Sequence, residues 1–317
     1  MMGTTVVIVN YNTRGLLRSC LSSVLAEIPA EVIVVDNAST DDSCTVIRNE
    51  FPAIPVLRNN ENMGYGAAAN RAVACCTSPY VLLLNSDTLL QPGTLKELAC
   101  YLDRNPHVAI AGPKLVGVDR RLQPSCFPFP TPLDILLDAS NLTRLARFVP
   151  VLKDRYLRSW CHDRSRRVPW VAGAALAIRR EAFEAVGGFD ESFFMYYEEV
   201  DLCYRLTHSG WQIHYTPSAE IIHIGSASTQ LHRAEMIVQF YSSLAHFYQR
   251  HYSWWRLAQL TLLIKCIVFA RLVRDKVLLS ATKDLHRRTR LAENITAWRR
   301  LLIEEWWGRT ATESHCG

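Results

Sequence analysis

The chain has 317 residues, of which 49% are hydrophobic and 21% are charged. This balance excludes a disordered chain and favours one large or two smaller globular domains. The net charge of +5 is uneven, because residues 254–317 hold 12 Lys and Arg against 6 Asp and Glu, while the remainder is close to neutral. The ten cysteines form neither a C-x-x-C pair nor a regular spacing, which argues against a disulfide framework and favours reduced thiols in the cytoplasm. The N-terminus has no basic stretch, so we expect no signal peptide.

The first 90 residues alternate short apolar runs, typical of strands buried on both faces, with helical patterns. In chain order these segments are 6–9, 16–25, 32–35, 56–57, 66–76 and 80–84. Repeated β-α units predict a parallel sheet with right-handed crossovers. Ligands of such sheets bind at the carboxyl ends of the strands, where Asp36 and Asp87 lie.

The later part of the chain divides at a proline-rich stretch. Prolines at 124, 128, 130 and 132 predict a loop and a boundary between lobes. A second α/β stretch is expected from Trp170 to about Ser228, and the remaining residues show helical patterns.

Two segments of the first half combine polar side chains with turn residues. Asp36 and Asn37 follow a predicted strand, so this turn either hydrogen-bonds a base or a ribose, or is closed by its own side chains. The segment 62–70 places Gly64 among small residues, which suits close approach to a phosphate but equally a tightly packed helix start. It is not a G-x-G-x-x-G fingerprint, so dinucleotide binding is not supported.

Candidate metal ligands follow two other predicted strands. Asp87 ends the segment Asn85-Ser86-Asp87, where a carboxylate can hold a hard divalent cation that bridges two phosphates, or can cap a turn. His223 ends the predicted strand 220–222. A lone histidine is more often structural, yet a His and an Asp at adjacent strand ends can share a metal.

Three carboxylates within four positions are the sharpest signal for catalysis. Glu198, Glu199 and Asp201 follow a run of aromatic residues, and apolar neighbours raise a carboxylate pKa toward the value that a general base needs. A structural account explains one or two of them, because acids are stabilised at a helix N-terminus and Asp201 can pair with Arg205 at i, i+4.

Taken in order, these segments resemble the family-2 glycosyltransferases of the GT-A fold, over roughly residues 5 to 250. The matching segments are 6–12 (VVIVNYN), 34–40 (VVDNAST), 62–70, 82–88 (LLLNSDT), 112–113, 171–178 (VAGAALAI), 187–191 (GGFDE), 193–205 and 223–226. The subgroup that the chain resembles most is the bacterial rhamnosyltransferase-like enzymes of cell-surface polysaccharide assembly.

The resemblance implies an α/β fold of the GT-A type, in which helices flank a Rossmann-like and mostly parallel sheet, with a C-terminal helical extension. Residues 1–115 are then the half that binds the nucleotide-sugar, and residues 116–230 are the acceptor-binding and catalytic half. Residues 231–317 form a helical region that we expect to associate with a membrane.

The resemblance also assigns roles to site residues. The counterpart of Asp36 contacts the nucleotide base, and the counterpart of Asp87 binds the metal, with His223 as a further ligand in some relatives. The acidic pair that supplies the base maps to Glu198-Glu199, with Asp201 as the alternative base.

Further positions are assigned to the sugars and the nucleotide. Gly173 and Tyr197 are expected to contact the acceptor or the donor sugar. The other positions expected to bind the nucleotide-sugar are Asn10, Asn12, Asn37, Asn62, Gly64, Asn70, Asn85 and Ser86.

Two positions depart from the family pattern. Asn85 stands where many relatives have the first Asp of the D-x-D motif, so the metal depends on Asp87 alone from this loop. Glu199 stands where Asp is usual, one methylene longer. The Q-x-x-R-W signature of processive relatives is absent from the sequence, which favours transfer of one sugar per encounter.

The expected reaction is an inverting transfer supported by Mg²⁺ or Mn²⁺. The subgroup favours dTDP-rhamnose as donor, with UDP-galactofuranose or another UDP-hexose as alternatives, and a lipid-linked or saccharide hydroxyl as acceptor. One competing hypothesis is a sugar-nucleotide pyrophosphorylase, which needs a Gly-rich basic loop where residues 10–14 read NYNTR. Another is a non-catalytic scaffold that binds nucleotide-sugars, against which the retained acids count.

The basic C-terminal region holds five of the eight tryptophans, which favours contact with an anionic membrane surface over nucleic acid. Residues 257–273 are mostly apolar, but Lys265 and Arg271 argue against a full span, and the scattered polar residues show no regular amphipathic pattern. We expect a peripheral protein on the cytoplasmic face of the inner membrane; the alternative is a helix packed on the catalytic lobe or a partner subunit. The side chains expected at the lipid surface are Trp254, Trp255, Trp306, Trp307, Arg271, Arg274, Lys276, Arg287, Arg288 and Arg290.

Overall fold

A computed structural model describes residues 3–140, 160–225 and 233–303. The described residues group into two compact units. The first holds residues 3–129, 160–191 and 198–225, and the second holds residues 130–140, 192–197 and 233–303. The three-part division of the chain at 115 and 230 stays a prediction.

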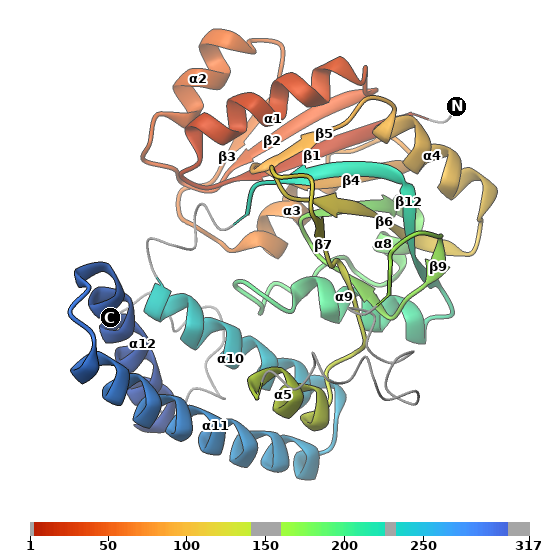
Figure 1. Cartoon of the computed structure of the whole chain (residues 1–317). Helices are drawn as coiled ribbons and strands as arrows, with labels where there is room; N and C mark the ends of the chain where they lie inside the picture. Colours follow the sequence, from red (N-terminus) through yellow and green to blue (C-terminus); the bar gives the residue numbers. More distant parts are fainter. Residues whose placement is uncertain (1–2, 141–159, 226–232, 304–317) are drawn as a thin grey trace. The chain divides into compact units, whose positions relative to one another are not determined.

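The first unit begins with the parallel β-α units that the sequence predicts (Figure 1). Strand β1 lies between β2 and β4, and β3 extends this part of the sheet beyond β2. The four strands are β1 (Thr4–Asn10), β2 (Glu31–Asp36), β3 (Val56–Arg58) and β4 (Tyr80–Asn85). The helices between them are α1 (Arg14–Ala26), α2 (Ser43–Glu50) and α3 (Tyr65–Val73).

The other half of the sheet is mixed. Strand β11 is antiparallel to both β4 and β6, and β12 is parallel to β6 and antiparallel to β5. These strands are β5 (Thr88–Leu90), β6 (Val108–Val116), β11 (Ala175–Arg179) and β12 (Gln212–His223). Two-residue strands β7 (Leu122–Gln123) and β9 (Arg166–Arg167) pair with β6 and β12, while β8 (Cys126–Phe127) pairs with β10 (Trp170–Val171).

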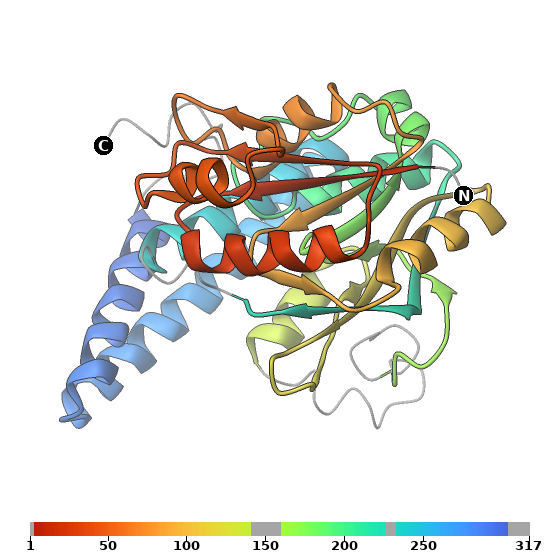
Figure 2. The same cartoon turned by 90° about the horizontal axis from the view of Figure 1, so that it is seen from above.

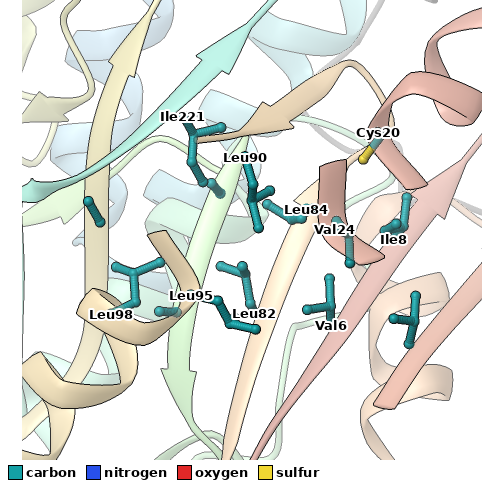
Figure 3. Close-up of a cluster of buried hydrophobic side chains, with 14 of the residues drawn as sticks. Val6, Ile8, Cys20, Val24, Leu82, Leu84, Leu90, Leu95, Leu98 and Ile221 are labelled. Carbon is teal, nitrogen blue, oxygen red and sulfur yellow. The ribbon is translucent and has the colours of Figure 1, made fainter. Parts of the chain in front are cut away.

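Alternating side chains of the buried strands build one core on each face of the sheet. Val6 and Ile8 point to the core under α1 and α4 (Thr94–Arg104), whereas Val7 points to the other core. Figure 3 shows the first of these cores, where side chains from β1, β4, β5 and β12 meet those of the two helices. The second core lies under α3, α8 (Arg180–Ala185) and α9 (Glu198–His208). The sheet is therefore covered on both faces, and its strand ends are left to form a site.

The second unit is helical. Its helices are α5 (Pro132–Ala139), α10 (Arg233–His251), α11 (Trp254–Ala281) and α12 (Leu285–Ile303). α11 and α12 lie side by side, and both contact α10 (Figure 1, Figure 2). Among the residues described, no helix is long and apolar enough to cross a membrane. The α/β fold with a C-terminal helical extension is confirmed in the described ranges.

Candidate active site

Asp36 is fully buried, and its carboxylate joins the carboxyl ends of β1 and β2. Its Oδ1 accepts a hydrogen bond from Asn10 Nδ2 at 3.1 Å, and its Oδ2 accepts from the Ser39 backbone N–H at 3.1 Å. The Arg58 Nε lies 3.8 Å from Oδ2. The carboxylate therefore shapes the turn after β2, and its contact with the nucleotide base stays a prediction.

Thr13 connects this turn to the end of β4. Its hydroxyl donates to Asn10 Oδ1 at 2.7 Å and lies 2.6 Å from Ser86 Oγ. Asn12, which has a positive φ of 52°, accepts at Oδ1 from the Thr40 backbone N–H at 2.8 Å. Sequence reasoning did not single out Thr13, although its place immediately before α1 is a common one for a hydroxyl.

Asn37 organises the loop between β3 and α3. Its Nδ2 donates to Asn62 Oδ1 at 2.7 Å and to the Gly64 carbonyl at 3.1 Å. Its Oδ1 accepts from Asn59 Nδ2 at 2.9 Å and from the Met63 backbone N–H at 3.1 Å. The amide therefore uses its full capacity of two donors and two acceptors inside the protein. Gly64 has a φ of 83°, a conformation that glycine adopts without strain.

Asn70 anchors the Gly-Gly-Phe-Asp-Glu loop to α3. Its Nδ2 donates to the Phe189 carbonyl and to Glu191 Oε1, both at 2.9 Å, and its Oδ1 accepts from the Phe189 N–H at 2.9 Å. A side chain at Gly188 would place Cβ 2.6 Å from this Oδ1. Asn70 and Asn37 thus shape the site, while their predicted contacts with the nucleotide-sugar stay predictions.

Asp87 and His223 lie side by side, because β12 pairs with β5 so that His223 is opposite Thr88. Asp87 Oδ1 is 3.5 Å from His223 Nε2. This oxygen is buried and accepts no hydrogen bond within the described structure. The backbone of the same loop is held where the Asp87 carbonyl accepts from the Ile224 N–H at 2.9 Å.

Gln123 sets the tautomer of His223. Its Nε2 donates to the His223 carbonyl at 2.9 Å, which leaves its Oε1 facing His223 Nδ1 at 2.9 Å. An amide oxygen accepts only, so Nδ1 carries a proton and Nε2 is the ring nitrogen that faces Asp87. No local sequence signal marks Gln123, which is 100 residues from its partner.

Glu198 and Glu199 begin α9. Glu198 is only 7% exposed, and burial, together with the charge of Glu199, raises the pKa of Glu198 well above its ordinary value. Glu199 lies against Gly173, where an added Cβ would be 3.6 Å from the Glu199 Cβ, Cγ and Cδ atoms. An added Cβ at Gly173 would therefore be in ordinary van der Waals contact with the glutamate side chain.

Tyr65 brings the acids of both halves into one electrostatic environment. Its hydroxyl is 3.5 Å from the Gly173 carbonyl. Burial raises the pKa of Tyr65 first, and the charges of Glu198, Glu199 and Asp87 raise it further. Tyr65 was not among the predicted site residues, because a tyrosine at a helix start carries no distinctive pattern.

Asp201 has a different environment from the two glutamates. It is fully buried, and Arg205 Nε lies 2.7 Å from its Oδ2, which confirms the i, i+4 pair expected from the sequence. Arg205 also donates to the carbonyls of Val186 and Gly188, both at 2.7 Å. Asp201 is therefore held in a buried ion pair that ties α9 to the loop before it.

Tyr197 belongs to the second unit, where its ring contacts Phe240 and Phe247 of α10 at centroid distances of 5.5 and 6.0 Å. Its φ of 69° follows a φ of 65° at Tyr196, two left-handed residues in succession before α9. Within the first unit, the structure brings together Asp87, His223, Gly173 and the two glutamates.

Comparisons with known proteins identify the family of the chain. Residues 2–255 match the family described as "Glycosyltransferase like family 2". An N-acetylglucosaminyl-diphospho-decaprenol L-rhamnosyltransferase of Mycobacterium tuberculosis is 32% identical over 269 residues, which are 79% of this chain and 86% of the relative. A dTDP-rhamnosyl transferase of Shigella flexneri is 23% identical over 235 residues, which are 71% of this chain and 70% of that protein.

Solved structures show the same fold. A mannosyltransferase of Pyrobaculum calidifontis, in complex with GDP-Man and Mn²⁺, superimposes with a TM-score of 0.55 at 18% identity, covering 96% of this chain and 88% of that one. GalNAc-T7 with UDP, GalNAc and Mn²⁺ gives a TM-score of 0.54 at 16% identity, covering 78% and 50%. These likenesses confirm the predicted GT-A fold. By its motifs and by the match to most of its length, the chain belongs to the family-2 glycosyltransferases.

Proposed function

We propose that this protein transfers a sugar from a nucleotide-sugar to an acceptor hydroxyl with inversion, and that the donor is dTDP-L-rhamnose. The rhamnosyltransferase names of two relatives support the choice of sugar. One observation carries the chemistry: a buried Asp87 oxygen without a hydrogen bond lies 3.5 Å from His223 Nε2, and Asp87 and two glutamates all act on the hydroxyl of Tyr65.

Asp87 and His223 fit a divalent cation. A carboxylate oxygen and an imidazole nitrogen together suit Mn²⁺, and Mg²⁺ is the harder alternative. The described residues contain no group of three or more His, Cys, Asp or Glu side chains that could hold a metal, so a bound ion would also need oxygen ligands from the donor diphosphate or from water. When bound, such an ion neutralises the charge that develops on the nucleoside diphosphate leaving group.

Glu199 is our choice for the general base. Arg205 already holds the Asp201 carboxylate, and burial together with the charge of Glu199 raises the pKa of Glu198 well above its ordinary value, which disfavours its charged form. In the proposed reaction the acceptor oxygen forms a bond to the anomeric carbon of the donor sugar while the bond from that carbon to the diphosphate breaks. The proton of the acceptor hydroxyl passes to Glu199. Such a base contributes about 10²–10⁴-fold to the rate.

We further propose that the acceptor is lipid-linked and that the protein works as a peripheral protein on the cytoplasmic face of the inner membrane. The decaprenol in the name of the mycobacterial relative supports a lipid-linked acceptor. The excess of Lys and Arg after residue 254 supports attraction to anionic lipid.

The direct test is a panel of dTDP-, UDP- and GDP-sugars, assayed for nucleotide release with and without a lipid-linked acceptor. We expect acceptor-dependent release from dTDP-rhamnose that EDTA removes and Mn²⁺ restores. Asp87→Asn should lose this release. The matched control is Asp119→Asn, which makes the same change at an exposed position of the same unit and should leave release unchanged. Formation of a nucleotide-sugar and pyrophosphate from a sugar 1-phosphate and a nucleoside triphosphate would favour the pyrophosphorylase, and binding without turnover would favour the scaffold.

A further inference from the structure

Helix α11 exposes a second apolar face that the packing of its own unit does not use. Trp255, Leu262, Phe269 and Val277 are each between 60% and 67% exposed, and Val273 is 48% exposed. Successive members lie seven or four positions apart, so they fall on one line along the helix, here called the outer stripe. From Trp255 to Val277 it is about 33 Å long at 1.5 Å per residue.

The opposite side of α11 is buried. Leu260, Ile264, Val268 and Leu272 follow one another at intervals of four residues, on the side where the helix contacts α10 and α12. When a helix has apolar stripes on two opposite sides, its sequence shows no single apolar face opposite a polar one. This explains why residues 257–273 show no regular amphipathic pattern in the sequence, although the helix is buried on one side and apolar on the other.

The charges beside the outer stripe are basic. Lys276 lies along one edge and Arg256 along the other, and both are exposed. The only acid of α11 is Asp275, which is fully buried and accepts hydrogen bonds from Trp298 Nε1 at 3.0 Å and Arg274 Nε at 2.8 Å. No acidic side chain of this helix therefore reaches the exposed side.

The structure also changes which basic residues are free to meet lipid. Arg271 donates to the Tyr241 hydroxyl at 3.1 Å and stacks over the Trp298 ring at 5.3 Å, so the packing of the unit occupies it. Arg288 donates to the carbonyls of Leu279 and Thr282. Arg287 and Arg290 are exposed near the start of α12, and Trp306 and Trp307 lie outside the described residues.

We propose that the outer stripe of α11 is a membrane-docking face that lies in the plane of an anionic lipid surface, with its apolar side chains among the upper acyl chains. The inference rests on the membrane association proposed above and names the element responsible. The stacked rings of Trp254 and Trp255, 4.0 Å apart at one end of the stripe, suit the headgroup level. Anionic headgroups would neutralise the exposed Lys276 and Arg256, and no acidic side chain of α11 lies on this side of the helix to repel them.

The test is flotation of the full-length protein with phosphatidylcholine vesicles that contain or lack phosphatidylglycerol, in the absence of any sugar donor. The double variant Leu262→Glu/Phe269→Glu places two acids in the stripe. Ile28→Glu/Val118→Glu makes the same chemical change at exposed positions of the first unit. We expect the wild type and the control to float with anionic vesicles, and the stripe variant to lose at least about 10-fold in partitioning.

Circular dichroism must show that the stripe variant is folded, and its nucleotide release with a soluble acceptor should equal that of the wild type. The two measurements separate the two proposals. If the wild type floats with anionic vesicles but shows no turnover, the proposed glycosyl transfer is wrong and the docking face stands. Flotation of the stripe variant like the wild type would overturn the docking face. The docking face would also be overturned if the wild type were a dimer, the stripe variant a monomer, and flotation the same for both. The stripe would then join two copies of this chain.

Discussion

Replacing Gln123 with Leu should weaken metal binding without touching either proposed ligand. The Gln123 Oε1 accepts from His223 Nδ1 at 2.9 Å and thereby leaves Nε2, which lies 3.5 Å from Asp87 Oδ1, as the nitrogen available to a metal. Leucine has a similar size but cannot accept this proton, so the ring can turn or change tautomer. Removing a hydrogen-bond partner of this kind typically costs 10–100-fold in metal affinity, or about 1.4–2.7 kcal/mol.

The measurement is Mn²⁺ binding in the presence of dTDP, followed through the EPR signal of the free ion. Gln123→Glu is the informative comparison, because a carboxylate still accepts from Nδ1 while it loses the donor to the His223 carbonyl. We expect it to bind Mn²⁺ at least as tightly as the wild type. If Gln123→Leu binds Mn²⁺ with wild-type affinity, then Gln123 does not position His223 for a metal.

Two further outcomes concern the acids of the site. Asp87→Ala should abolish nucleotide release while the protein stays folded, and chelation of the wild type should have the same effect; full activity in either case would remove the metal assignment. Glu199→Gln should lower kcat by about 10²-fold or more with little change in donor binding. Asp201→Asn should instead act mainly on stability: its thermal midpoint should fall while kcat changes little, because Arg205 is left beside a neutral partner. If the two phenotypes are exchanged, Asp201 is the base.

The parts of the fold that the sequence predicts correctly are those with local patterns. The apolar runs that become β1, β2 and β4 are buried on both faces, and such strands need only their own residues to be recognised. The antiparallel insertion of β11 between β4 and β6 was not anticipated. Its pairing depends on partners 91 to 99 residues earlier in β4 and 66 to 68 residues earlier in β6, and no short window records that choice.

In the site, too, residues with a local sequence signal were predicted and residues that act through distant partners were not. Asp87 and His223 were expected to meet because both end strands, and they do. Thr13 and Gln123 were missed, since each acts through a partner that is 73 or 100 residues away. The asparagines at 37 and 70 were selected as ligand contacts, and the structure shows that they also hold loops together. An asparagine suits both tasks with the same groups, so residue type alone cannot separate them.

Asp275 offers a last test, one of the packing that carries the outer stripe. Burial alone would raise its pKa, but hydrogen bonds from Trp298 and Arg274 and the charge of Arg274 outweigh burial, so the pKa of Asp275 is lowered from 3.8. A lowered folded-state pKa contributes stability that is present above the unfolded value and is lost as pH falls through the folded one. Asp275→Asn should therefore destabilise α11 and α12 by about 1–3 kcal/mol at pH 7, because a neutral amide replaces a charged acceptor. The gap to the wild type should shrink below about pH 4, where protonated Asp275 comes to resemble the amide. Protection factors of α12 amides in hydrogen exchange, compared between the two proteins at each pH, measure this gap. A gap that stays constant from neutral to acidic pH would show that the charge of Asp275 does not stabilise the helical pair.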